Sequence, residues 1–290
     1  MPHLAAHPAD FLHAAIARCH ESPICVGLDP VLEQFPAEVR AKHHEPLAAV
    51  AEFCRGVLTA ISDVVPAVKF QSACFERYGS RGVQLLEELS ESAASMGLVV
   101  VWDAKRGDIG VSAAHYAAAA RRMHAHFVTV NGYLGASGVE PFVEAGLGVF
   151  VLVRTSNVDS DAVQSAKLAD GRTVAESMAA MVSGLGERYV GASGWSSVGA
   201  VVGATKASDG GALRARMPGQ YFLIPGYGAQ GGRAADVRMM LGRGGGGVLV
   251  TSSRAVIYAP QESGDESWTV AVRGAAERMA RELAGVVRGV

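Results

Sequence analysis

Eight short apolar segments recur along this chain, and longer stretches whose apolar residues have helical spacing lie between them. This rhythm is typical of repeated strand–helix units, because parallel strands need a helical connection between them. Eight units predict an α/β fold: a single-domain (β/α)8 TIM barrel over residues 1–290, with an N-terminal helical extension over about residues 1–22. A doubly wound open sheet is the alternative, and the number of units favours the barrel. The expected strands are residues 24–28, 67–70, 98–102, 127–130, 149–153, 199–202, 221–224 and 247–251.

Composition excludes several classes of protein. The net charge is −2, so the chain has no broad electrostatic attraction for nucleic acid. It has neither an uncharged apolar run of about 18 residues nor a signal-peptide pattern at its start, so we expect no membrane partner. The four cysteines form no CxxC pair, which is typical of reduced thiols and favours a cytoplasmic protein.

The segment 100–110 (VVWDAKRGDIG) combines a buried strand with three charged residues at its end, Asp103, Lys105 and Asp108. Strand alternation places Asp103 and Lys105 on one face. Two carboxylates around one ammonium can hold a lysine charged in a dry site and present its proton to a developing carbanion. A purely structural ion-pair network at a strand end is the alternative interpretation.

In a barrel of this kind, catalytic groups lie at the carboxyl ends of the strands, and phosphate often binds after strands seven and eight. Polar residues end or follow the predicted strands at that rim. They are Asp29, Lys69, Asp103, Lys105, Asp108, Asn131, Thr155, Ser156 and Arg254. Residues 225–232 (PGYGAQGG) form a glycine-rich turn whose backbone N–H groups favour an anion, and Gln230 and Arg254 can add donors. The alternative interpretation is that the glycines only form a tight turn and that Arg254 pairs with a surface carboxylate.

No metal site is expected. All nine histidines lie at or before His126. The pair His124 and His126 precedes the fourth strand, at the rim opposite the predicted site. Residues 158–172 are polar and are expected to form a surface excursion before the following helix.

Taken in order, the motifs GLDP, VKF, DAKRGD, RTSN, PGYGAQGG and SSR resemble those of the orotidine 5′-phosphate decarboxylase family, in particular its longer bacterial branch. The resemblance covers about residues 20–285. It implies a homodimeric (β/α)8 barrel with shared active sites. It also implies conversion of orotidine 5′-phosphate to uridine 5′-phosphate and CO2, the last step of de novo UMP synthesis, without a metal or organic cofactor.

The resemblance also assigns roles to individual residues. Lys105 is expected to donate a proton to C6, and Asp103 to lie near the departing carboxylate. Asp108 is expected to enter the neighbouring subunit's site, where it completes the charged network with Lys69, and Ser112 to touch the ribose there. The remaining expectations are Asp29 at the ribose, Ser156 or the adjacent Thr155 at the pyrimidine edge, and Gln230 and Arg254 at the phosphate. The sequence VNGYLG lacks the proline expected after Asn131.

Three other functions are compatible with parts of this pattern. A metal-dependent sugar-phosphate lyase or decarboxylase of the same barrel superfamily would use the acidic residues to bind Mg²⁺, but Lys69 stands where such an enzyme needs a carboxylate. A Schiff-base aldolase would use Lys69 or Lys105 as its amine. A non-catalytic nucleotide-binding barrel would have no use for the charged cluster.

Overall fold

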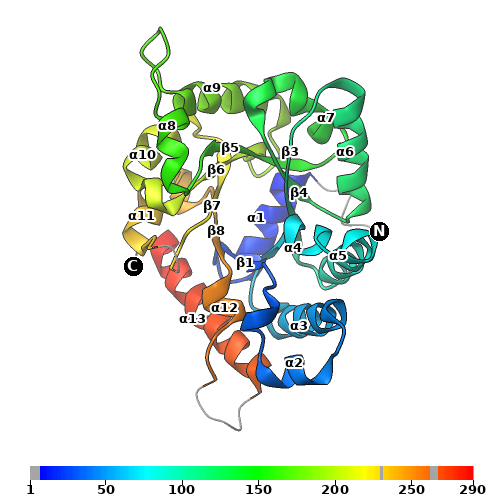
Figure 1. Cartoon of the computed structure of the whole chain (residues 1–290). Coiled ribbons are helices and arrows are strands. Elements are labelled where there is room, and N and C mark those ends of the chain that lie inside the picture. Colours follow the sequence, from blue (N-terminus) through cyan, green and yellow to red (C-terminus); the bar gives the residue numbers. More distant parts are fainter. Residues whose placement is uncertain (1–6, 229–230, 262–266, 290) are drawn as a thin grey trace.

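The eight predicted strands form a closed parallel barrel in which each strand pairs with the next and β8 pairs with β1 (Figure 1). The computed structural model describes residues 7–228, 231–261 and 267–289. The predicted TIM barrel is therefore confirmed. The strands are β1 Ile24–Leu28, β2 Ala67–Gln71, β3 Val99–Arg106, β4 Phe127–Val130, β5 Gly148–Arg154, β6 Ser196–Val202, β7 Gln220–Ile224 and β8 Val248–Ser252.

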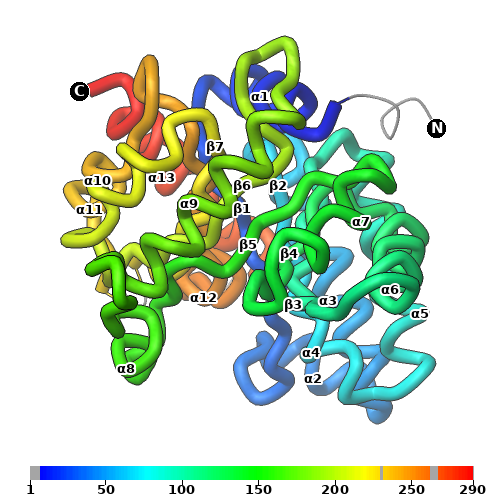
Figure 2. Tube along the Cα trace, turned by 90° about the horizontal axis from the view of Figure 1, so that it is seen from above, coloured from blue at the N-terminus to red at the C-terminus, as the bar shows by residue number. Residues whose placement is uncertain are grey.

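Helices surround the barrel and cover the outer faces of the strands (Figures 1 and 2). The longer ones carry apolar residues on the face that packs against the strands, as their helical spacing predicts. None of the helices in the described part of the chain is long and apolar enough to cross a membrane. The helices are α1 Pro8–Arg18, α2 Ala37–Lys42, α3 Pro46–Ile61, α4 Ser72–Glu76, α5 Gly79–Ser95, α6 Gly110–Arg122, α7 Glu140–Glu144, α8 Asp161–Gln164, α9 Val174–Gly186, α10 Ala207–Arg216, α11 Ala234–Arg238, α12 Arg254–Ile257 and α13 Trp268–Arg288.

Strand alternation divides the core into two parts. Residues such as Val100 and Trp102 of β3 point outward and pack with the helices, whereas Val99 and Val101 belong to a separate cluster inside the barrel. At the centre of that inner cluster, Phe127 of β4 and Phe150 of β5 stack with their ring centroids 4.9 Å apart. The same alternation then continues into polar residues at the carboxyl ends of the strands.

The N-terminal helix α1 closes one end of the barrel. Its buried residues Ala9, Phe11, Leu12 and Ala15 join the inner cluster, and the Phe11 ring stacks on His126 with centroids 4.6 Å apart. In Figure 2, α1 lies at the end of the barrel opposite α8 and α12. The barrel is therefore plugged at the amino ends of its strands, and its opening is at their carboxyl ends.

Strand β3 is longer than the sequence predicts, because it continues beyond residue 102 as far as Arg106. Its register with β4 shifts between Trp102 and Arg106, and Lys105 lies in the left-handed region with φ of 46°. A non-glycine residue in that region is strained by roughly 1–2 kcal/mol. The strand thus carries Lys105 on an irregular turn of backbone rather than on a regular pleat.

The polar segment 158–172 is not only a surface excursion, as the sequence suggests. It forms a 3-10 turn at Val158–Ser160, the short helix α8, and a hairpin closed by an antiparallel bridge between Lys167 and Thr173. The hairpin projects from the molecule above α8 in Figure 1, whereas α8 lies against the rim of the barrel and places Gln164 in the wall of the cavity described below.

Shortening Leu12 to alanine is expected to reduce the free energy of unfolding by about 2–5 kcal/mol, because its fully buried side chain fills the plugged end of the barrel. Urea denaturation followed by circular dichroism measures the loss. The exposed Ala17→Ser on the same helix is the control and is expected to change stability by less than about 1 kcal/mol. Equal, small effects of the two changes would show that α1 is not part of the core.

Candidate active site

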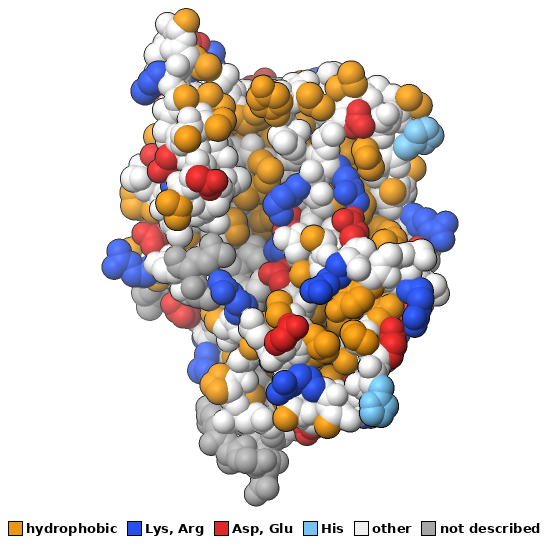
Figure 3. Space-filling model, in the orientation of Figure 1, with side chains coloured by type: hydrophobic (Ala, Val, Ile, Leu, Met, Phe, Trp, Pro, Cys, Tyr) orange, Lys and Arg blue, Asp and Glu red, His pale blue; other side chains and the backbone are white. Residues whose placement is uncertain are grey.

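A cavity of about 470 Å³ opens at the carboxyl ends of the strands, the rim that the sequence predicts. Figure 3 shows acidic and basic side chains meeting around the central hollow, with apolar side chains on either side of it. Every strand except β6 contributes a polar residue at or just beyond its end. The polar lining consists of Asp29, Lys69, Gln71, Asp103, Lys105, Thr129, Thr155, Ser156, Asn157, Gln164, Tyr227, Thr251, Ser253 and Arg254.

Asp103 is the centre of the charged groups in this cavity. Its Oδ2 accepts a hydrogen bond from Lys69 Nζ at 2.9 Å, and its Oδ1 accepts from Lys105 Nζ at 2.6 Å. Lys69 Nζ also donates to Asp29 Oδ1 at 3.2 Å. Two carboxylates and two ammonium groups therefore alternate in one chain of contacts with no net charge, which is the arrangement that buried charges require.

The two innermost groups have strongly perturbed pKa values. Burial alone would raise the pKa of Asp103, but the neighbouring Lys69 and Lys105 ammonium groups lower it well below its usual range. Burial would lower the pKa of Lys69, but the carboxylates of Asp103 and Asp29 raise it above its usual range. Both groups are therefore held in their charged forms at neutral pH.

Lys105 differs from Lys69 in exposure and in how its backbone is held. The Lys69 side chain is 7% exposed, whereas that of Lys105 is 47% exposed and reaches into the cavity. Thr129 Oγ1 accepts from the Lys105 backbone N–H at 2.9 Å and donates to Asp103 Oδ1 at 2.8 Å. One hydroxyl thus fixes both the strained backbone of Lys105 and the carboxylate that Lys105 contacts.

Thr155 and Ser156 both line the cavity, and the structure distinguishes their hydroxyl groups. Thr155 Oγ1 accepts from Gln164 Nε2 at 2.8 Å and donates to Asn157 Oδ1 at 2.6 Å. Among the described residues, no hydrogen-bond partner is found for Ser156 Oγ, although its carbonyl oxygen accepts from Thr205. The Thr155 proton is therefore already used within the protein.

The structure describes Arg254 and most of the glycine-rich turn at the predicted phosphate end. Arg254 lines the cavity, is exposed, and forms no ion pair with any described residue. The backbone N–H groups of Gly228, Gly231 and Gly232 donate to carbonyl oxygens within the turn itself. The expectation that these N–H groups face an anion is therefore wrong, because the turn uses them to close on itself. Gln230 lies outside the described residues.

Asp108 and Ser112 do not line the cavity of their own barrel. Asp108 Oδ1 accepts from the Ile109 N–H at 2.8 Å, and both Asp108 and Ser112 are partly exposed. The loop after β4 forms a 3-10 turn at Gly132–Leu134, in which Asn131 Oδ1 accepts from the Tyr133 N–H at 3.0 Å. That contact fixes the start of the loop without the proline expected there.

Sequence reasoning missed Thr129, Gln71 and Gln164 as residues of the cavity. A signal existed for Thr129, because alternation from the inward-facing Phe127 places it on the same face, where a polar residue is unusual. Gln71 follows Lys69 by two residues and shares its face for the same reason. Gln164 had no such signal, because its place depends on how segment 158–172 folds back onto the rim.

The described part of the chain contains no group of three or more His, Cys, Asp or Glu side chains arranged to hold a metal ion. The two cavity carboxylates, Asp29 and Asp103, are instead bridged by Lys69. Fold and site together define a (β/α)8-barrel enzyme with a lysine–aspartate centre and an arginine, Arg254, in the lining of its cavity.

Comparison with known proteins narrows this class. The sequence profile of the orotidine 5′-phosphate decarboxylase / HUMPS family matches residues 22–265. The chain is 40% identical to the orotidine 5′-phosphate decarboxylase of Rhodopirellula baltica, over 94% of this chain and 98% of that protein. It is also 40% identical to that of Salinispora tropica, over 96% and 97%. The solved structure of Leishmania donovani OMP decarboxylase is 30% identical, covers 97% of this chain and 98% of that one, and superposes with a TM-score of 0.77.

The chain therefore belongs to the orotidine 5′-phosphate decarboxylase / HUMPS family. The resemblance stated from its strand-end motifs is confirmed. The metal-dependent sugar-phosphate lyase is not favoured, in agreement with the presence of Lys69 on β2 beside Asp29 and Asp103.

Replacing Asp103 by asparagine is expected to change how stability depends on pH. Because the pKa of Asp103 is lower in the folded than in the unfolded chain, the unfolded chain binds an extra proton below about pH 4. The stability that Asp103 provides is thus present above that pH and is lost on acidification, by up to about 1.4 kcal/mol per pH unit. Asp103→Asn should lack this part of the slope and be less stable at pH 7 by about 3–5 kcal/mol, since Lys69 keeps only Asp29.

Urea unfolding between pH 7 and pH 3 measures both effects. The control is Asp170→Asn in the exposed hairpin, where solvent screens the ion pair with Arg172. A slope for Asp103→Asn as steep as that of the wild type would contradict the low pKa of Asp103.

Proposed function

We propose that this chain converts orotidine 5′-phosphate to uridine 5′-phosphate and CO2 in UMP biosynthesis, with Lys105 as the proton donor to C6. The observation that carries the proposal is the position of Lys105. Its ammonium group is held 2.6 Å from Asp103 at the floor of the cavity, yet about half of its side chain is open to a ligand. The rim of the same cavity carries Arg254, which has no carboxylate partner among the described residues.

The reaction needs a cation beside C6, because negative charge develops on that atom. When the bond between C6 and the carboxylate breaks, CO2 leaves and its electron pair remains on C6, where the pyrimidine ring delocalises it poorly. A preorganised ammonium group stabilises that charge without reorganisation, which is commonly the largest contribution to catalysis. A proton then passes from Lys105 Nζ to C6, the new C–H bond forms, and the neutral amine regains a proton from solvent.

The other polar groups would hold the substrate. In this proposal Asp103 lies beside the substrate carboxylate, and Lys69 keeps Asp103 and Asp29 charged and in place. Asp29 binds the ribose, and Ser156 reads the pyrimidine edge. The role of Ser156 is supported by the hydrogen bonds that already engage the Thr155 hydroxyl with Asn157 and Gln164. Gln230 and Arg254 bind the phosphate. Binding energy gained at the phosphate is then available to position the base over Lys105.

We further propose that the enzyme is a cytoplasmic homodimer with shared sites. The cytoplasm is supported by the four cysteines, all of which are free thiols. The dimer is supported by exposed apolar side chains: Ile109 and Val111, which follow Asp108 in the chain, are 57% and 71% exposed, and Tyr133 in the loop after β4 is 81% exposed. Asp108 and Ser112 lie outside their own cavity and are placed by this proposal in the partner's site.

Lys105→Ala is expected to lower kcat/KM by on the order of a thousandfold or more, because the residue supplies both the cation and the proton, worth about 4 kcal/mol. The assay follows the absorbance of orotidine 5′-phosphate in buffer containing EDTA. The wild type is expected to keep its full rate there, because Lys69 and Lys105 occupy the carboxylates that a metal would need. Lys42→Ala is the control, because Lys42 is exposed and does not line the cavity. Near-normal activity of Lys105→Ala would reject its role.

Mixing two inactive variants tests the shared site. Lys105→Ala and Asp108→Asn are each expected to be inactive, whereas a heterodimer gathers both defects into one site and leaves the other intact. Random exchange of subunits makes half of the dimers mixed, so about a quarter of wild-type activity should return, by the two-fold symmetry. Native mass spectrometry verifies the exchange. If mixed dimers form without activity, Asp108 serves its own barrel.

A further inference from the structure

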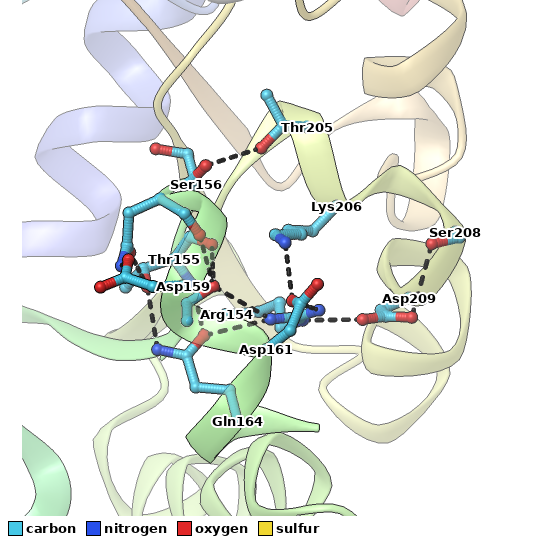
Figure 4. A network of polar contacts seen from close by, with 12 residues as sticks. Arg154, Thr155, Ser156, Asp159, Asp161, Gln164, Thr205, Lys206, Ser208 and Asp209 are labelled. Carbon is cyan, nitrogen blue, oxygen red and sulfur yellow. Dashed lines mark hydrogen bonds and ion pairs between the residues drawn. The ribbon is translucent and has the colours of Figure 1, made fainter. Parts of the chain in front are cut away.

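The segment 158–172 reaches back to the catalytic cavity through one residue. Gln164, the last residue of α8, is partly buried and lines the cavity together with Thr155, Ser156 and Asn157. Figure 4 shows its side chain directed from α8 toward the strand-five loop that carries Thr155 and Ser156. Neither the fold nor the reaction described above requires a glutamine at this point.

Both ends of the Gln164 amide are engaged by Thr155. Gln164 Oε1 accepts from the Thr155 backbone N–H at 2.9 Å, and Gln164 Nε2 donates to Thr155 Oγ1 at 2.8 Å. The opposite amide orientation would place the NH2 group against the backbone N–H, so the contacts themselves fix which end is oxygen. Gln164 therefore sets both the backbone and the side chain of Thr155.

This contact determines which hydroxyl faces the cavity unengaged. With Gln164 donating to it, Thr155 Oγ1 directs its only proton to Asn157 Oδ1 at 2.6 Å. The next residue, Ser156, has its carbonyl oxygen held by Thr205 Oγ1 at 3.1 Å, while no described residue bonds its hydroxyl. Of two adjacent hydroxyl groups, the one on Ser156 remains available for a ligand.

The helix that carries Gln164 is anchored by charge. Arg154, whose side chain is 5% exposed, donates to Asp161 Oδ1 at 2.5 Å and to Asp209 Oδ2 at 2.7 Å. Lys206 Nζ also contacts Asp161 Oδ1, at 2.6 Å (Figure 4). Asp161 begins α8 and Gln164 ends it, so this network fixes the helix against the rim and thereby fixes the position of the amide.

We propose that Gln164 is a positioning residue for base recognition, which engages Thr155 so that Ser156 alone reads the pyrimidine edge. This inference rests on the proposed function, because it takes Ser156 as the base reader. It predicts that Gln164 contributes to the binding of ligands that carry the base and contributes nothing to ligands that lack it.

The test compares UMP with ribose 5-phosphate, which lacks the base, by isothermal titration calorimetry on the full chain. Gln164→Met is expected to weaken UMP binding about tenfold, the loss of about one hydrogen bond, and to leave ribose 5-phosphate binding unchanged. Gln164→Glu keeps the size of the side chain but cannot donate to Thr155 Oγ1, and it should show the same selective loss. Gln84→Met, an exposed glutamine on α5, is the control and should bind both ligands normally.

A double-mutant cycle with Ser156→Ala supplies the second readout. Because Gln164 acts through Ser156, the double variant should bind UMP no more weakly than Ser156→Ala alone. Equal weakening of both ligands by both Gln164 variants would overturn the inference and indicate general loosening of the cavity, as would fully additive losses in the cycle. If Ser156→Ala weakens UMP binding and the Gln164 variants do not, the inference fails while the proposed base reader stands. If Ser156→Ala has no effect on UMP, both fail.

Discussion

The contact of Asp103 with two ammonium groups is the constraint around which the site is arranged. A carboxylate that is 7% exposed would be unstable alone. Lys69 and Lys105 offset that instability from two neighbouring strands, and Thr129 completes the coordination from a third. Because each of these groups must meet the same carboxylate, the registers of β2, β3 and β4 and the chemistry of the cavity depend on one another.

Much of this architecture could be predicted from local pattern. The strand positions follow from short apolar runs, and the convergence of Asp29, Lys69 and Arg254 follows from the rule that the carboxyl ends of parallel strands meet at one rim. Alternation predicts Asp103 and Lys105 on one face, and the two side chains do meet, although Lys105 lies on irregular backbone. In these cases a property of a few neighbouring residues determined where a side chain points.

Other features depend on contacts that neighbouring residues do not encode. The left-handed backbone at Lys105 is held by Thr129, which lies on another strand. The hydrogen bonds that Gly228 and Gly232 donate within their own turn depend on its backbone conformation. Glycine permits several such conformations, so the sequence does not specify which one forms. Gln164 reaches the cavity only because Arg154 and Asp161 hold α8 in place. In each case the local sequence permits several conformations, and contacts with residues elsewhere in the chain determine which one forms.

The plug formed by α1 has a consequence for the passage of molecules. With Phe11 and Leu12 filling one end of the barrel, and aromatic rings packed across its middle, the described residues leave the cavity open at the carboxyl ends of the strands. Substrate and both products then pass the same end of the barrel, where Arg254 lines the cavity. A uridine 5′-phosphate molecule retained in the cavity therefore blocks the entry of the next substrate molecule, in addition to occupying the groups that bind it.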